Sequence, residues 1–124
     1  MIIVAACYLL VSGRKMNTEI NKILIDEVLH HLVKAYNPLA IYLFGSYAWG
    51  SPDTSSDIDF FVIVDKSEYD AAERIRIGLR ELKDIHADID ILVYTRAEVA
   101  ARKTHPSTLT YKVLNKGVKL YEAT

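Results

Sequence analysis

Cysteine is almost absent from this 124-residue sequence, in which Cys7 is the only one. A lone cysteine cannot form an internal disulfide or a cysteine-rich zinc site, so we expect a reducing, cytoplasmic setting. Neither charge sign is in excess, because 15 Lys and Arg residues face 16 Asp and Glu residues. Proteins that coat nucleic acid need clustered basic residues, so we expect no direct nucleic-acid binding. The length suits one compact domain.

Long hydrophobic runs are also missing. The first twelve residues, MIIVAACYLLVS, are mostly apolar, but a membrane-spanning helix needs about 20 such residues. The positive charges of Arg14 and Lys15 follow this stretch, whereas a secretory signal carries its charge before the apolar part. We therefore expect no membrane association. We interpret residues 1–15 as an extension before a domain at residues 16–124, the alternative being an extra strand or helix packed on that domain.

The remaining sequence alternates between helix-like and strand-like segments. Apolar residues repeated every three or four positions predict amphipathic helices, and short β-rich apolar runs predict strands. The expected order is a helix at 20–36, a strand at 39–44, a small-residue turn at 45–56, a strand at 57–64, a helix at 69–85, a strand at 88–94, a helix at 96–103, a short helix after 107 and an edge strand at 118–121. This order predicts an α/β (α+β) fold in which a small sheet is flanked by helices.

Capping patterns mark the starts of three of these helices. They are Ser67 with Asp70, Thr95 with Glu98, and Ser107. The helix at 69–85 carries an apolar side, formed by Ala72, Ile75, Leu79 and Leu82.

Acidic residues stand at the head of two strands, in the sequences DIDFFVIV and DIDILVY. Asp57 and Asp59 point to one face, because strand side chains alternate with a period of two. If the strands are neighbours, Asp90 joins them; Asp88 alternates in phase with it, and Asp90 is favoured because it directly precedes the apolar run. Three converging carboxylates repel one another unless a cation binds, and oxygen ligands favour Mg²⁺, with Mn²⁺ as a substitute.

A second chemical signal lies in the turn before these acids. Gly45 and Ser46 directly follow a buried strand, where backbone N–H groups and a hydroxyl suit phosphate oxygens. Together with the acids, the segment GSYAWGSPDTSSDIDFFVIV resembles the signature of the polymerase-β-like nucleotidyltransferase superfamily. The short chain is similar to its minimal nucleotidyltransferase (MNT) branch, from the helix near Ile20 to the C-terminal GVKLYE. The resemblance implies the superfamily fold, with a small mixed β-sheet.

The resemblance also implies roles for individual residues. Gly45 and Ser46 would hold the nucleotide triphosphate, and Asp57 and Asp59 would bind two divalent ions. Asp90 would be the third metal ligand or the base that activates the acceptor hydroxyl. Two metal ions suit an in-line displacement at the α-phosphate that releases pyrophosphate.

One position departs from the family pattern. Trp49 stands where many relatives carry an arginine beside the phosphates. Either another basic residue supplies that charge or nucleotide binding is weaker. Two further roles remain open for Trp49, stacking on a base and packing at the end of the motif.

The resemblance points to a protein acceptor, because relatives this short lack the extra domain that holds RNA or an antibiotic. It implies an ATP-dependent nucleotidyltransferase (EC 2.7.7 type) that acts as an antitoxin by transferring AMP to a tyrosine of a HEPN-domain toxin. One alternative is a catalytically weak antitoxin that neutralises its partner by binding. Another is a small-molecule nucleotidyltransferase that needs a separate substrate-binding subunit.

Overall fold

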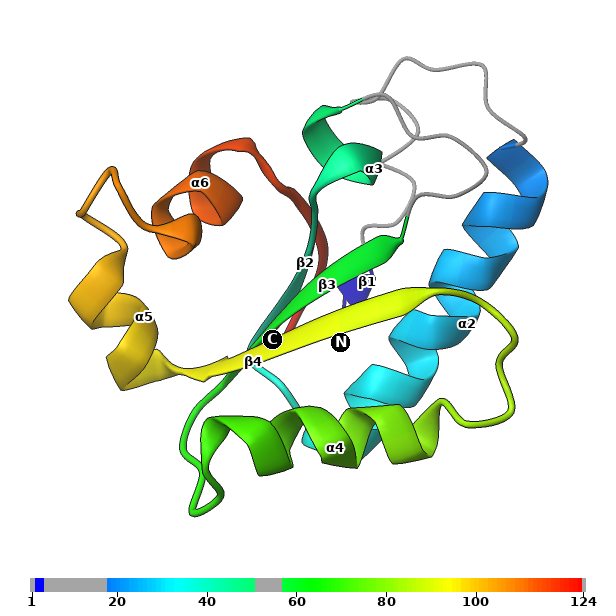
Figure 1. Ribbon diagram of the computed structural model, residues 1–124, viewed down its shortest axis with the longest axis horizontal. Coiled ribbons are helices and arrows are strands. Elements are labelled where there is room, and N and C mark those ends of the chain that lie inside the picture. Colours follow the sequence, from blue (N-terminus) through cyan, green and yellow to red (C-terminus); the bar gives the residue numbers. More distant parts are fainter. Residues whose placement is uncertain (1, 4–17, 51–56, 124) are drawn as a thin grey trace.

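A five-stranded sheet with the order β1-β5-β2-β3-β4 forms the centre of the computed structural model (Figure 1). The structure describes residues 2–3, 18–50 and 57–123, and their side chains from Lys22 onward. The elements are β1 (Ile2–Ile3), α2 (Thr18–Tyr36), β2 (Ala40–Phe44), α3 (Ser46–Trp49), β3 (Ile58–Val64), α4 (Ala71–Glu81), β4 (Ile89–Thr95), α5 (Arg96–Arg102), α6 (Leu109–Lys116) and β5 (Val118–Glu122).

The sheet is mixed, as the family resemblance implied. β3 and β4 run parallel, and the β2–β3, β2–β5 and β1–β5 pairs are antiparallel. Residues 118–121 form a strand as expected, but its expected place at the sheet edge is wrong, because β1 pairs with the outer side of β5. Most of the proposed extension lies outside the described residues. No helix in the described part of the chain is long and apolar enough to span a membrane.

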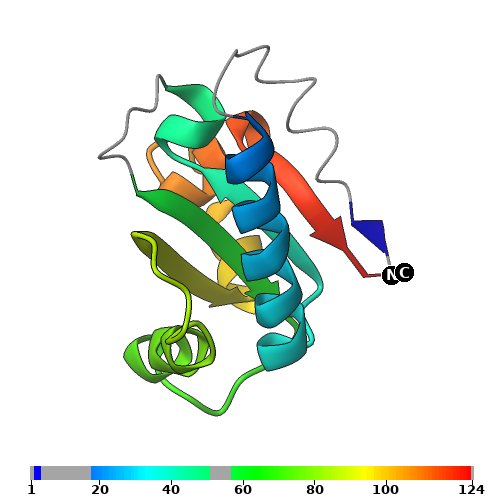
Figure 2. The same ribbon diagram turned by 90° about the vertical axis from the view of Figure 1, so that its right-hand side faces the viewer.

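One face of the sheet is covered by α2, with α4 packed beside it (Figure 2). The α2 side chains Val28, Leu29 and Leu32 are fully buried and form one core with inward residues of all four longer strands. Phe60, Val62 and Val64 of β3 lie in this core, and Phe61 and Ile63 lie in a second core on the other face, so β3 is a continuous apolar run.

The other face carries α5 and α6. A second core on this side is centred on Phe61, which is fully buried and makes edge-on ring contacts with Phe44 and Tyr94. Val99 of α5 and Val113 of α6 complete it. α5 and α6 thus cover this face of the sheet, where they contact β2, β3 and β4.

The buried side of α4 differs from the expected one. Of the four residues expected to face inward, Leu82 is buried and Ile75 is half-buried, whereas Leu79 is 44% exposed and Ala72 is exposed. Arg74 and Gly78 are buried in their place. A Cβ at Gly78 would overlap the hydroxyl of Tyr36, which itself donates a hydrogen bond to the Arg74 carbonyl. The close contact of Gly78 with Tyr36 of α2 therefore favours the orientation in which Gly78 and Arg74 face inward.

Two of the three expected helix caps also differ. Asp70, and not Ser67, caps α4, since its side chain accepts a hydrogen bond from the Glu73 N–H. Thr108, and not Ser107, caps α6. The capping box of α5 is present as expected, with Thr95 and Glu98 hydrogen-bonded to each other's backbone N–H groups.

Candidate active site

The parallel register of β3 and β4 places Asp59 directly opposite Asp90. The predicted adjacency of the two acidic strands is therefore confirmed, and the register distinguishes Asp90 from Asp88. The Asp88 carbonyl instead accepts a hydrogen bond from the Ile58 N–H. Asp57 immediately precedes β3 and is exposed.

Gly45 lies against this acidic pair. Phe44, the last residue of β2, is the register partner of Asp59, so the turn that follows β2 begins beside the Asp59 carboxylate. Gly45 has φ +76°, a conformation that favours glycine, and a Cβ there would overlap the Asp59 carboxylate. Ser46 then begins α3. The Gly-Ser turn and the carboxylates, which were separate signals in the sequence, therefore meet at one place.

The acids influence one another electrostatically. Burial, followed by the negative charges of Asp90 and Asp57 and a hydrogen bond with Asp90, raises the pKa of Asp59 from 3.8 to about 6. Asp59 is half-buried, while Asp57 and Asp90 are exposed. The folded protein thus concentrates negative charge at one end of β3 and β4.

The donor set suits a hard divalent cation. Carboxylate oxygens are the ligands that Mg²⁺ prefers, and a cation would relieve the repulsion from Asp90 and Asp57 that adds to the effect of burial on the Asp59 pKa. Within the described ranges, no three His, Cys, Asp or Glu side chains already stand in a metal-binding arrangement. Asp57, Asp59 and Asp90 have the carboxylate oxygens that such a cation binds, and their roles as its ligands stay a prediction.

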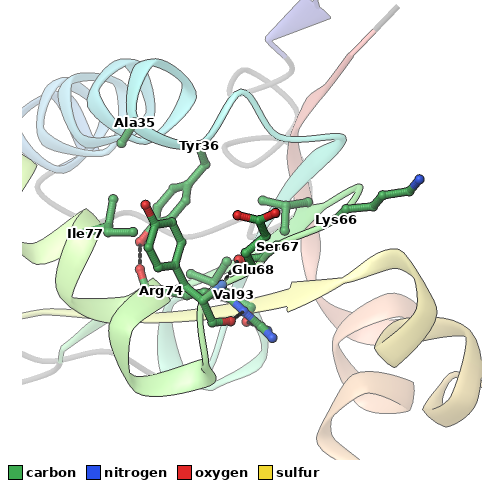
Figure 3. Close-up of a pocket in the computed structure, with 10 residues that line it drawn as sticks. Ala35, Tyr36, Lys66, Ser67, Glu68, Arg74, Ile77 and Val93 are labelled. Atoms are coloured by element: carbon green, nitrogen blue, oxygen red, sulfur yellow. Dashed lines mark hydrogen bonds between the residues drawn. The ribbon is translucent and has the colours of Figure 1, made fainter.

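A pocket of about 420 Å³ adjoins the acids, with Asp59, Asp90 and Phe44 in its wall beside apolar residues of β4 and α4. A second pocket, of about 280 Å³, lies near the other end of β3, between α2 and the start of α4 (Figure 3). The buried guanidinium of Arg74 in its wall is already paired with Glu98 at 2.7 Å and bonded to the Val93 carbonyl. That arrangement connects α4, β4 and α5, and we assign it a structural role.

Trp49 ends α3 and packs its ring against Phe44, with ring centroids 6.2 Å apart. The Nζ of Lys112, on α6, lies 4.4 Å from the centre of the Trp49 ring. The sequence did not single out Lys112, because nothing local links α6 to this turn. The sequence contains only an indirect signal. No Lys, Arg or His occurs between Gly45 and Asp59, so a basic side chain near this turn must come from another element.

Comparisons with known proteins agree with this architecture. Residues 26–124 match the family model described as "Polymerase beta, Nucleotidyltransferase". No curated protein matches the sequence.

Solved structures with a similar fold include a protein from Sulfolobus solfataricus assigned as a nucleotidyltransferase. It is 22% identical with a TM-score of 0.57, over 80% of this chain and 78% of that one. A toxin–antitoxin complex with AMP-PNP (20% identity, TM-score 0.57) and an MntA-HpeT toxin–antitoxin mutant with two Asp-to-Glu substitutions (20%, 0.58) each match 80% of this chain and 73% of theirs. At these identities, the structural likeness establishes the fold. The family match covers most of the chain, and the chain belongs to the polymerase β nucleotidyltransferase family.

Proposed function

We propose that this protein is a Mg²⁺-dependent nucleotidyltransferase that transfers AMP from ATP to a tyrosine hydroxyl of a cognate HEPN-domain toxin, and so acts as its antitoxin. The observation that carries the proposal is the position of Asp59. Its carboxylate lies between Asp90 on β4 and the turn at Gly45. Groups suited to a metal ion and groups suited to phosphate oxygens are therefore adjacent.

Each residue has a defined role in this proposal. Asp57, Asp59 and Asp90 would hold two Mg²⁺ ions, for which Mn²⁺ could substitute. Gly45 and Ser46 would contact the triphosphate. When bound, the ions supply neutralisation of charge on the phosphate oxygens. The pKa of about 6 leaves Asp59 mostly ionised at neutral pH, as a metal ligand must be.

The transfer conserves atoms and charge in a single displacement. The acceptor oxygen forms a bond to the α-phosphorus of ATP as the bond from that phosphorus to the bridging oxygen breaks. Pyrophosphate leaves with the electron pair of the broken bond, and Asp90, where it acts as the base and not as the third metal ligand, takes the hydroxyl proton. The turn at Gly45 holds the phosphates in place, so catalysis depends on positioning and charge.

The choice of acceptor and nucleotide draws on the structural neighbours. Two of them are toxin–antitoxin assemblies, and one of these contains AMP-PNP, an ATP analogue. The MntA-HpeT mutant carries its substitutions at two aspartates two positions apart, which is the spacing of Asp57 and Asp59 here. These parallels favour ATP and a toxin partner over a small-molecule acceptor.

Incubating the protein with its partner, Mg²⁺ and ATP labelled on the α-phosphate tests the proposal. We expect label on the partner, and we expect Asp59→Asn to abolish it. Asp65→Asn is the matched control, because Asp65 is an exposed aspartate at the opposite end of β3 and pairs only at the surface with Arg96. Absence of transfer by the wild-type protein, or transfer that survives Asp59→Asn, contradicts the proposal.

A second candidate is an antitoxin that neutralises its toxin by contact alone. Trp49 favours it, because this residue places no charge where a nucleotide would need one. Co-expression with the toxin separates the two functions. If the Asp57→Asn/Asp59→Asn double variant still restores growth, contact is the mechanism; if growth is lost while the complex still forms, catalysis is required.

A further inference from the structure

The cation–π pair of Lys112 and Trp49 joins α6 to α3. Lys112 is exposed, and its ammonium is held over an indole ring that itself packs on Phe44. The lysine is thereby fixed next to the turn that begins at Gly45, although it comes from a helix far along the sequence. Exposed cation–π contacts are weak, so a stronger anionic partner can take the ammonium.

The contacts lead from this lysine to the acidic site. Trp49 lies against Phe44, and Phe44 is the register partner of Asp59 on the same face of the sheet. Lys112 and Asp59 are thus on one side of the sheet, connected through Trp49 and Phe44, the two residues that flank Gly45–Ala48 in the sequence. A molecule seated on the turn would lie beside the Asp59 carboxylate, and the Lys112 ammonium reaches the same segment at Trp49.

Lys112 forms no ion pair among the described residues, as is also true of Lys22, Lys66, Lys83, Lys103 and Lys116, and what distinguishes it is its contact with Trp49. No carboxylate of the described residues lies within 4 Å of its Nζ, whereas many other basic side chains pair with acids. The paired ones are Lys34, Arg74, Arg76, Arg80, Arg96 and Lys119. Because residues 45–59 contain no basic side chain, a cation for an anion bound at this turn must come from another element.

We propose that Lys112 binds the phosphate chain of the nucleotide at the Gly45–Ser46 turn, and that Trp49 is the residue that positions it. This inference rests on the proposed nucleotidyl transfer. Phosphate oxygens near Asp59 and Asp90 are repelled by both carboxylates, and a nearby ammonium offsets that repulsion. Lys112 thus contributes the positive charge that the motif itself lacks.

The proposal is tested by measuring nucleotide binding in the presence of Mg²⁺. Calorimetry and the fluorescence of Trp49, the only tryptophan of the sequence, report the binding. Adenosine, AMP and AMP-PNP differ in their number of phosphates, so their affinities isolate the phosphate contact. We expect Lys112→Gln to weaken AMP-PNP binding about tenfold or more, as for a hydrogen bond to a charged group, with about twofold or less for adenosine. Lys112→Arg should restore most of the loss.

Lys66→Gln is the control, since Lys66 is an exposed lysine just beyond the opposite end of β3 and its loss changes the net charge equally. Thermal unfolding of each variant verifies that it folds. If the wild type binds AMP-PNP and Lys112→Gln binds it equally well, or loses adenosine to the same degree, the role of Lys112 is refuted while the proposed function stands. If the wild type binds no nucleotide, both are refuted.

Discussion

Asp59→Asn is expected to stabilise the ligand-free protein at neutral pH while it abolishes transfer. The carboxyl ionises at about pH 6 in the folded protein and near its ordinary value of 3.8 when unfolded. Between about pH 4 and pH 6 the folded state therefore holds more protons than the unfolded state, so the free energy of unfolding falls as pH rises through this window. Above it the full penalty remains, and Asn removes that penalty.

The size of the effect follows from the pKa difference. A difference of about two pKa units at roughly 1.4 kcal/mol each gives a ceiling of about 3 kcal/mol. Asp59 is only half-buried, so solvent screening lowers the expected gain to about 1 kcal/mol. Asn has nearly the same size and keeps a hydrogen-bonding group toward Asp90, so packing should change little.

Urea unfolding of the wild type and Asp59→Asn, followed across about pH 4.5 to pH 8, measures this difference. The variant should gain stability at the upper end and little at the lower end, while Asp65→Asn should show no such pH-dependent gain. Added Mg²⁺ should stabilise the wild type more than the variant. A variant less stable than the wild type at about pH 7.5, or a gain independent of pH, would refute the electrostatic reasoning.

Three further substitutions probe the turn, the buried ion pair and the second core. Gly45→Ala places a Cβ on the Asp59 carboxylate at a positive φ, so initial rates of transfer should fall at least about tenfold; wild-type rates would show that the close approach is dispensable. Arg74→Ala removes the ion-pair partner of Glu98 and should lower the free energy of unfolding by about 2–3 kcal/mol in urea titrations. A loss under about 1 kcal/mol would contradict a structural role for Arg74. Phe61→Ala empties the centre of the second core and should cost about 3–4 kcal/mol by the same measurement, with a cost under about 1 kcal/mol counting against that packing.

Local patterns predicted most elements because those elements obey local rules. The apolar run of β3 is buried on both faces, and the Thr95–Glu98 capping box depends only on residues three apart. The helix at 69–85 was less well predicted, since its inward side is chosen by distant partners. Arg74 is buried because Glu98 and the Val93 carbonyl satisfy its guanidinium, and neither is adjacent in sequence.

The acids of the candidate site could be predicted from period-two alternation, which relates residues on one strand. Alternation could not decide between Asp88 and Asp90, because that choice depends on the register of β4 against β3. The closeness of Gly45 to Asp59 likewise depends on the antiparallel pairing of β2 with β3. Lys112 was missed for a similar reason, since only the packing of α6 brings it to Trp49.

A net charge of −1 gives little indication of the ligand, because the charges are unevenly placed. Asp59 and Asp90 face each other at one end of β3 and β4, with Asp57 just before β3, and the ammonium of Lys112 lies over Trp49, at the end of the short helix that follows Gly45. Near-neutral composition argues against a long polyanion, which needs many cations along its length. It permits a short anion that binds together with divalent ions. The ions would pair with the three carboxylates, and the phosphates would pair with the lysine. A metal-bound nucleoside triphosphate meets both demands, whereas a bare metal ion would leave Lys112 unused.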